Sequence, residues 1–191
     1  MKLTEFFHLK QEEKTVPPEE PMSSTEALST AFGILTRHDT VVADAIAECL
    51  TDTEAYCLTH NDILERRGLR YAEEAVPWLR VIAAVESAVK QGYLRELKGD
   101  CEPDSFAAEV RKSLVAAGID YPVDGISFDN AKGLAAWARQ FNEYAGQSGI
   151  TLCFVDLYGD DRVMGAARIA DYAEAAEIAG YAGVKITSRP E

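Results

Sequence analysis

Residues 23–92 carry apolar side chains three and four positions apart, the spacing that places them on one face of a helix. The stretch from Trp78 through Ile82 and Val85 to Val89 repeats at steps of four, three and four, so we expect it to face a core. Residue types that cap helices or fit their first turn precede each apolar stretch. The expected helix starts are Ser23 (with Glu26 as its capping-box partner), Asp39, Asp52, Asn61 or Asp62, and Pro77.

Short apolar runs bounded by glycine and aspartate alternate with helical runs after residue 92. The expected strands cover residues 93–98, the two arms of a hairpin within 150–168, and 184–188. The expected helices cover residues 103–118, a segment capped by Asp129 that buries residues from Leu134 to Ala145, and 169–180. The C-terminal order is therefore strand, strand, helix, strand, with one earlier strand available to join the sheet.

This order of elements predicts an α+β fold. We expect a small, mainly antiparallel sheet, built from the C-terminal β-β-α-β segment and one earlier strand. Helices would lie on one face, with a helical layer built from the N-terminal half. Residues 23–191 then form a single α+β domain, with a helical part over 23–92 and a mixed part over 93–191.

Residues 1–22 are expected to form an N-terminal arm outside this domain. Phe6 and Phe7 are followed by the proline- and acid-rich segment 17–21, which cannot bury enough apolar surface to fold alone. Two alternatives are open: the arm is flexible, or its phenylalanines dock on the body or on a neighbouring subunit. Docking on a neighbouring subunit would give a dimer, and the oligomeric state is left open.

Acidic residues strongly outnumber basic ones, since 32 Asp and Glu against 19 Lys and Arg give a net charge of −13. Such a surface repels nucleic-acid backbones and anionic lipid, and the basic pairs Arg66-Arg67 and Arg111-Lys112 stand apart. We therefore expect neither nucleic acid nor membrane as a partner, whereas a basic protein would suit the charge. No apolar run approaches a membrane span and no signal peptide is evident, so we expect a cytoplasmic location.

Cysteine and histidine spacing predicts neither a disulfide framework nor a metal site. The four cysteines form no C-x-x-C pair; Cys49 lies in a helical pattern and Cys153 in a strand pattern, as buried reduced thiols do. The three histidines lie far apart, without the spacing of metal ligands. His60 and Asp62 are a neighbouring His–acid pair, which we interpret as part of a helix cap rather than as a catalytic pair.

The segment Tyr158-Gly159-Asp160-Asp161 lies at the turn of the expected hairpin and matches the metal-binding turn of many RNA-directed polymerases. Two-metal catalysis needs converging carboxylates, and Asp156 would lie on the same side of the strand as Asp160. A chain of 191 residues has no room for polymerase fingers and thumb, and its charge leaves no basic template channel. Gly-Asp also suits a tight hairpin turn, since such turns need positive φ. We therefore interpret the tip as a turn.

Two functions remain open. No phosphate-binding loop, nucleophile elbow or zinc-protease motif is present, so we assign no catalytic residue, no cofactor-binding residue and no metal ligand. The favoured hypothesis is an acidic cytoplasmic module that binds or regulates a basic protein without catalytic activity. The alternative is an enzyme or metal-binding protein whose site lies at the hairpin, with Asp156, Asp160, Asp161, Tyr158 and Arg162 contributing.

Three segments carry a family resemblance: Pro77-Trp78-Leu79, the strand 93–97, and the run from Phe154 through the acidic turn to Val184-Lys185-Ile186. Over residues 70–188 the chain resembles an uncharacterised family of small bacterial proteins. One departure is Lys98-Gly99-Asp100, where the family has Asp-Trp-Lys. The resemblance implies a bacterial, non-enzymatic domain in which the acidic turn belongs to the fold.

Overall fold

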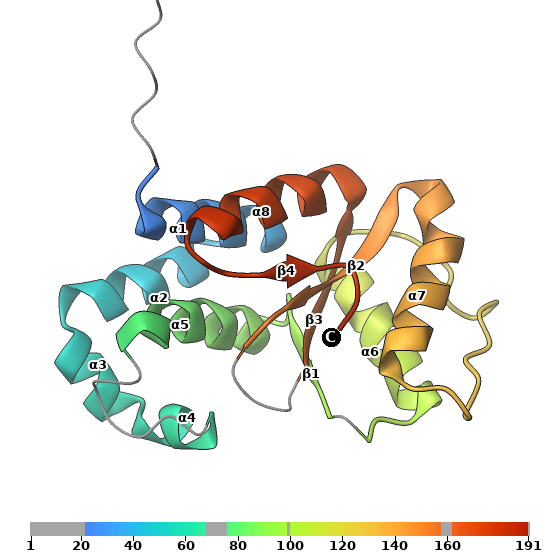
Figure 1. Ribbon diagram of the computed structural model, residues 1–191, viewed down its shortest axis with the longest axis horizontal. Helices are drawn as coiled ribbons and strands as arrows, with labels where there is room; N and C mark the ends of the chain where they lie inside the picture. Colours follow the sequence, from blue (N-terminus) through green and yellow to red (C-terminus); the bar gives the residue numbers. More distant parts are fainter. Residues whose placement is uncertain (1–21, 68–75, 99, 158–161, 191) are drawn as a thin grey trace, which may run out of the picture.

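The computed structural model describes residues 22–67, 76–98, 100–157 and 162–190, and its helices and strands are shown in Figure 1. The α-helices are α1 (Ser24–Leu35), α2 (Thr40–Thr51), α3 (Thr53–Thr59), α4 (Asn61–Arg66), α5 (Val76–Lys90), α6 (Pro103–Ala116), α7 (Leu134–Ala145) and α8 (Ile169–Tyr181). The strands are β1 (Arg95–Leu97), β2 (Ile150–Val155), β3 (Arg162–Arg168) and β4 (Ile186–Thr187), with a 3₁₀ turn η1 (Gly146–Ser148) before β2. None of the helices in these ranges is long and apolar enough to cross a membrane.

The strands form one antiparallel sheet in the order β1-β3-β2-β4. β2 and β3 make the hairpin that the sequence predicts, in a register that runs from Ile150 opposite Arg168 to Val155 opposite Val163. The earlier strand β1 pairs with β3, and β4 pairs with the end of β2. The predicted α+β fold, with its C-terminal β-β-α-β order and one added strand, is therefore confirmed.

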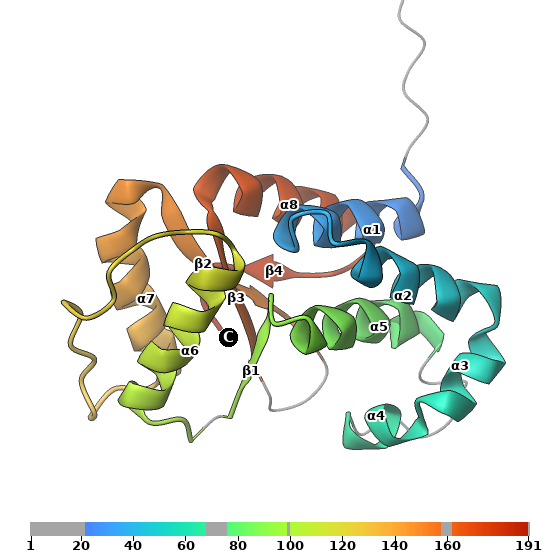
Figure 2. The same cartoon turned by 180° about the vertical axis from the view of Figure 1, so that it is seen from behind.

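Helices cover both faces of the sheet (Figure 1, Figure 2). Leu152 and Phe154 of β2 belong to an apolar core that includes residues of α6 and α7. Cys153 and Val155 belong to a second core, where α8 and the N-terminal helices α1, α2 and α5 cover the opposite face. All six residues of β2 are buried, which explains why this strand is a continuous apolar run rather than an alternating one.

A side chain from α7 covers the part of β2 that β4 does not reach. The Leu152 N–H donates a hydrogen bond to Oδ1 of Asn142 (2.8 Å), and Nδ2 of Asn142 donates to the Ser188 carbonyl (2.6 Å). The amide therefore satisfies a backbone group that would otherwise lie at an open sheet edge, and it links α7 to the residues that follow β4.

The first three helices are capped by the residues that the sequence predicts. Ser23, Asp39 and Asp52 each accept a hydrogen bond from a backbone N–H in the first turn of α1, α2 and α3. α4 begins at Asn61, and α5 begins one residue before Pro77. Polar capping side chains thus set the starts of α1, α2 and α3 by satisfying first-turn N–H groups.

The predicted cap of α7 is wrong, because Gly133 rather than Asp129 occupies the cap position. The carboxylate of Asp129 instead accepts a hydrogen bond from the Ala131 N–H (2.9 Å), and its carbonyl accepts one from the Trp137 indole (2.8 Å). An aspartate that closes a local turn and one that caps a helix both bind backbone N–H groups nearby, so composition alone does not separate them. The apolar face from Trp137 to Ala145 is buried, as predicted.

Residues 158–161 at the hairpin tip lie outside the described residues, as do residues 1–21 of the predicted arm. The interpretation of the tip as a turn and the arm's two alternatives therefore stay predictions. Next to the tip, Asp156 has an exposed side chain and its N–H donates to the Lys185 carbonyl (2.9 Å).

Candidate functional site

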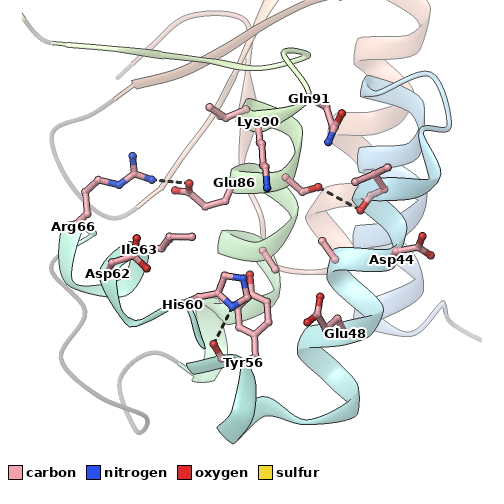
Figure 3. A pocket seen from close by; sticks show the side chains of 15 residues that line it. Asp44, Glu48, Tyr56, His60, Asp62, Ile63, Arg66, Glu86, Lys90 and Gln91 are labelled. Carbon is pink, nitrogen blue, oxygen red and sulfur yellow. Dashed lines mark hydrogen bonds and ion pairs between the residues drawn. The ribbon is translucent and has the colours of Figure 1, made fainter. Parts of the chain in front are cut away.

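A cavity of about 650 Å³ lies between α2, α3, α4 and α5 (Figure 3). These helices form the end of the molecule opposite α6 and α7 (Figure 1). The cavity is lined by pairs of residues four positions apart, and residues at this spacing lie on the same face of a helix. The lining pairs of this kind are Asp44 and Glu48 on α2, Tyr56 and His60 at the end of α3, and Glu86 and Lys90 on α5.

The His60 ring stacks on the Tyr56 ring, with 4.1 Å between centroids and 19° between planes. Nδ1 of His60 lies 3.0 Å from the Tyr56 backbone carbonyl, an acceptor that requires the proton of neutral imidazole on Nδ1. Neutral His60 therefore presents Nε2 as an acceptor, and Figure 3 shows this second nitrogen on the cavity side. Burial, with a smaller contribution from the Cys49 thiol, raises the pKa of Tyr56 well above its usual range.

Two arginines at the end of α4 hold two glutamates, one from α5 and one from β1. Arg67, whose side chain is 4% exposed, pairs with Glu86 at 2.7 Å and also pairs with Glu96. Arg66 pairs with the same carboxylates, at 2.6 Å to Glu86 and 3.5 Å to Glu96. Each carboxylate thus contacts both guanidinium groups, and this four-residue network holds α4 against α5 and the sheet.

The charged side chains that line the cavity are mostly acidic. Glu86 is compensated by the arginines, whereas no ion pair within the described ranges involves Asp44, Glu48 or Asp62. Figure 3 shows Asp62 on one side of the cavity, with Asp44 and Glu48 on the other. The charged lining residues are Asp44, Glu48, Asp62 and Glu86 against Arg66 and Lys90, a net charge of −2 with His60 neutral.

The neighbours His60 and Asp62 both line this cavity. His60 occupies the cap position of α4, as the sequence suggests, but its side chain makes no capping hydrogen bond there. The ring instead turns back to the carbonyl of Tyr56. The pair therefore belongs to the cavity wall, and the capping role expected from its composition is not performed by the His60 ring.

All four cysteines are free thiols, and the prediction that Cys49 and Cys153 are buried is confirmed. Burial raises the pKa of Cys49 to about 11 and that of Cys153 to about 12. The pKa values of Cys57 and Cys101 are also raised, again mainly by burial. Because the thiolate is the nucleophile, these thiols are poorly suited to covalent chemistry at neutral pH.

The buried thiols predict a loss of stability at alkaline pH. Unfolded cysteines lose their protons near pH 9.0, whereas folded Cys49 and Cys153 keep theirs to about pH 11 and 12. The folded chain binds more protons in this interval, so the free energy of unfolding decreases as pH rises above 9. Urea denaturation at pH 8 and at about pH 10.5 measures the decrease. An equally steep decrease in the double variant Cys49→Ala/Cys153→Ala would assign it to other groups.

The hairpin residues that the sequence singles out do not join this cavity in the described part of the chain. Neither Asp156 nor Arg162 lines it, while Tyr158, Asp160 and Asp161 lie outside the described residues. Among the residues that the structure describes, no group of three or more His, Cys, Asp or Glu side chains could hold a metal ion. An enzymatic or metal site at the hairpin therefore stays a prediction.

Nothing in the sequence pattern marks Asp44, Glu48 or Lys90 as functional residues. Arg66-Arg67 stands in the sequence as an isolated basic pair. The four-residue spacing of Asp44 and Glu48 was visible, as was that of Glu86 and Lys90. Spacing within one helix shows which residues share a face, but it does not show which polar faces meet across a cavity.

A protein-family model matches residues 27–190, which is most of the chain. Its description is a domain of unknown function, DUF6630. The chain belongs to this family. The match confirms the predicted membership of an uncharacterised family. It includes α2 to α5, so the cavity lies within the DUF6630 domain. No curated protein and no solved structure matches the chain.

Proposed function

We propose that this DUF6630 protein is a cytoplasmic, non-catalytic module that takes a cationic segment of a partner protein into its acidic cavity. The observation that carries the proposal is the placement of Asp44, Glu48 and Asp62 around one cavity, outside every ion pair of the described ranges. A lysine or arginine side chain entering the cavity would compensate this charge.

The other lining groups suit a long cationic side chain. Val41 and Ile63 offer apolar surface for a methylene stem, while the carboxylates take the charged end. The stacked rings of Tyr56 and His60 add an aromatic surface, to which ammonium and guanidinium groups are attracted. The net charge of −13 would also accelerate the encounter with a basic partner.

The hydroxyl groups of the lining favour binding over covalent catalysis. Ser87 donates a hydrogen bond to the Val41 carbonyl (3.3 Å) and has no carboxylate or imidazole partner among its described contacts. Tyr56 holds its proton because burial raises its pKa. A nucleophile needs an adjacent base or a lowered pKa, and neither hydroxyl has one within the described part of the chain.

Isothermal titration calorimetry with hexalysine tests the proposal. We expect saturable binding that weakens as salt is added, because exposed charges are screened. The double variant Asp44→Asn/Glu48→Gln should weaken binding by about tenfold or more, which corresponds to 1.4 kcal/mol.

The control is Asp171→Asn/Glu174→Gln, which removes the same charge from exposed positions on α8. It should change the affinity less than about twofold, since it leaves the cavity intact. Equal weakening by the two double variants would show attraction to net charge alone and would overturn the proposal. Failure of hexalysine to bind would overturn it as well.

A further inference from the structure

A second hollow, of about 320 Å³, lies where the end of α5, β1 and the last turns of α6 meet. Figure 2 shows α5 running into β1 beside α6. Its charged lining residues are Arg95, Arg111 and Lys112, and no carboxylate lines it. Three cations without an acidic lining residue are unexpected in a chain of net charge −13. Gln91 lines both this hollow and the acidic cavity, so the two adjoin at the end of α5.

We propose that this basic hollow is a binding site for a phosphate group, carried by a small phosphate ester or present as the free ion. This proposal is separate from the function proposed for the acidic cavity. It adds a ligand of opposite charge at a different set of side chains.

Arg95 is the residue at the centre of the proposal. Its Nε is buried and makes no hydrogen bond within the described part of the chain. Its ion-pair partner in the described part of the chain is Glu109, whose Oε2 lies 3.7 Å away, too far for a hydrogen bond. A buried guanidinium N–H without an acceptor is costly, so a bound oxyanion would supply what the chain does not.

The two other cations are held by contacts that a ligand can replace. Arg111 donates from Nε (3.0 Å) and Nη2 (2.6 Å) to one oxygen of Asp124, whose side chain is 86% exposed. Lys112 pairs with Glu109 at 2.6 Å. Exposed pairs of this kind contribute little to stability, so exchange of their partners is inexpensive.

The donor set of the hollow suits a tetrahedral oxyanion. Two guanidinium groups can each offer a pair of N–H donors, and the ammonium of Lys112 adds further donors. Gly92 beside Arg95 has a φ of +84°, a backbone conformation that favours glycine. The ends of α5 and α6 also attract cations through their dipoles, but their carbonyls do not satisfy Nε of Arg95.

Isothermal titration calorimetry at pH 8 and fixed ionic strength, with inorganic phosphate and with glycerol phosphate, tests this site. We expect one saturable site per chain for at least one of them. The preferred one identifies the source of the phosphate group. Arg95→Gln should weaken binding by about tenfold or more, and Lys112→Gln, on the exposed face of α6, by about threefold or more.

Lys132→Gln is the control, because Lys132 lies on the loop before α7 and outside the lining. It should leave the phosphate affinity unchanged. The proposal is overturned if neither phosphate compound saturates, if Lys112→Gln and Lys132→Gln bind alike, or if acetate competes as well as phosphate does. Thermal unfolding of each variant identifies any variant that does not fold. If Arg95→Gln does not fold, the phosphate affinity of the folded Lys112→Gln variant decides whether the proposal holds.

Discussion

Replacing Arg67 with methionine should lower the free energy of unfolding by about 3 kcal/mol. Arg67 is a buried cation in contact with Glu86 and Glu96, and its loss leaves two partly buried carboxylates facing each other. The expected loss lies at the low end for a broken buried pair, because Arg66 still contacts both glutamates and Glu96 is 26% exposed. Urea denaturation followed by circular dichroism measures it.

The matched control is Arg111→Met, which breaks a pair at the surface. Because Asp124 is 86% exposed, that pair is screened by solvent, and we expect a loss of at most about 1 kcal/mol. Equal losses in the two variants would mean that the arginine–glutamate network does not hold α4 in place. The Arg67 variant should also bind hexalysine more weakly, since α3 and α4 form one wall of the cavity.

The substitution Gly165→Val should lower the free energy of unfolding by about 3 kcal/mol, which is the upper end of the range for overpacking a core. Gly165 lies in the middle of β3, opposite Cys153. A Cβ at this position would lie 2.7 Å from Cδ2 of Leu94 and 3.1 Å from the Cys153 sulfur. Both neighbours are buried and almost fully excluded from solvent, so neither can move aside without disturbing the sheet or the core.

Gly125→Val provides the comparison, because nothing lies within 4 Å of a Cβ built at Gly125. We expect Gly125→Val to change the free energy of unfolding by no more than about 0.5 kcal/mol. Thermal or urea denaturation of the two variants side by side separates overpacking from the general effect of replacing glycine. A Gly165 variant as stable as the Gly125 variant would contradict the packing described for β1, β3 and β2.

The fold was largely predictable because the signals that set it are local. Capping by Ser23, Asp39 and Asp52 depends only on the next few residues, and it appears as expected. The hairpin of β2 and β3 joins neighbouring segments, so its pairing also follows from the sequence. Asp129 shows the limit: the same local chemistry closes a turn there and leaves the cap of α7 to Gly133.

The candidate site was less predictable because its parts lie far apart in the chain. Arg66-Arg67 reads as an isolated basic pair in the sequence, yet it contacts Glu86 and Glu96, about twenty and thirty residues later. The pairing of a side chain with a distant one depends on how helices pack, which spacing within a single helix does not determine. In the sequence, His60 stands out because Asp62 lies two residues away. In the structure, its contact with Tyr56 defines the orientation of the His60 ring.

The most direct test of cation binding in the acidic cavity is amide chemical-shift mapping by NMR with ¹⁵N-labelled protein and hexalysine. We predict that the shifted amides cluster in residues 41–48, 56–66 and 83–91, the segments that contribute the cavity lining. We also expect the ring signals of His60 to move, because His60 lies on the cavity wall. Shifts concentrated on α7 or α8, or scattered over the acidic surface with His60 unaffected, would contradict cation binding in this cavity.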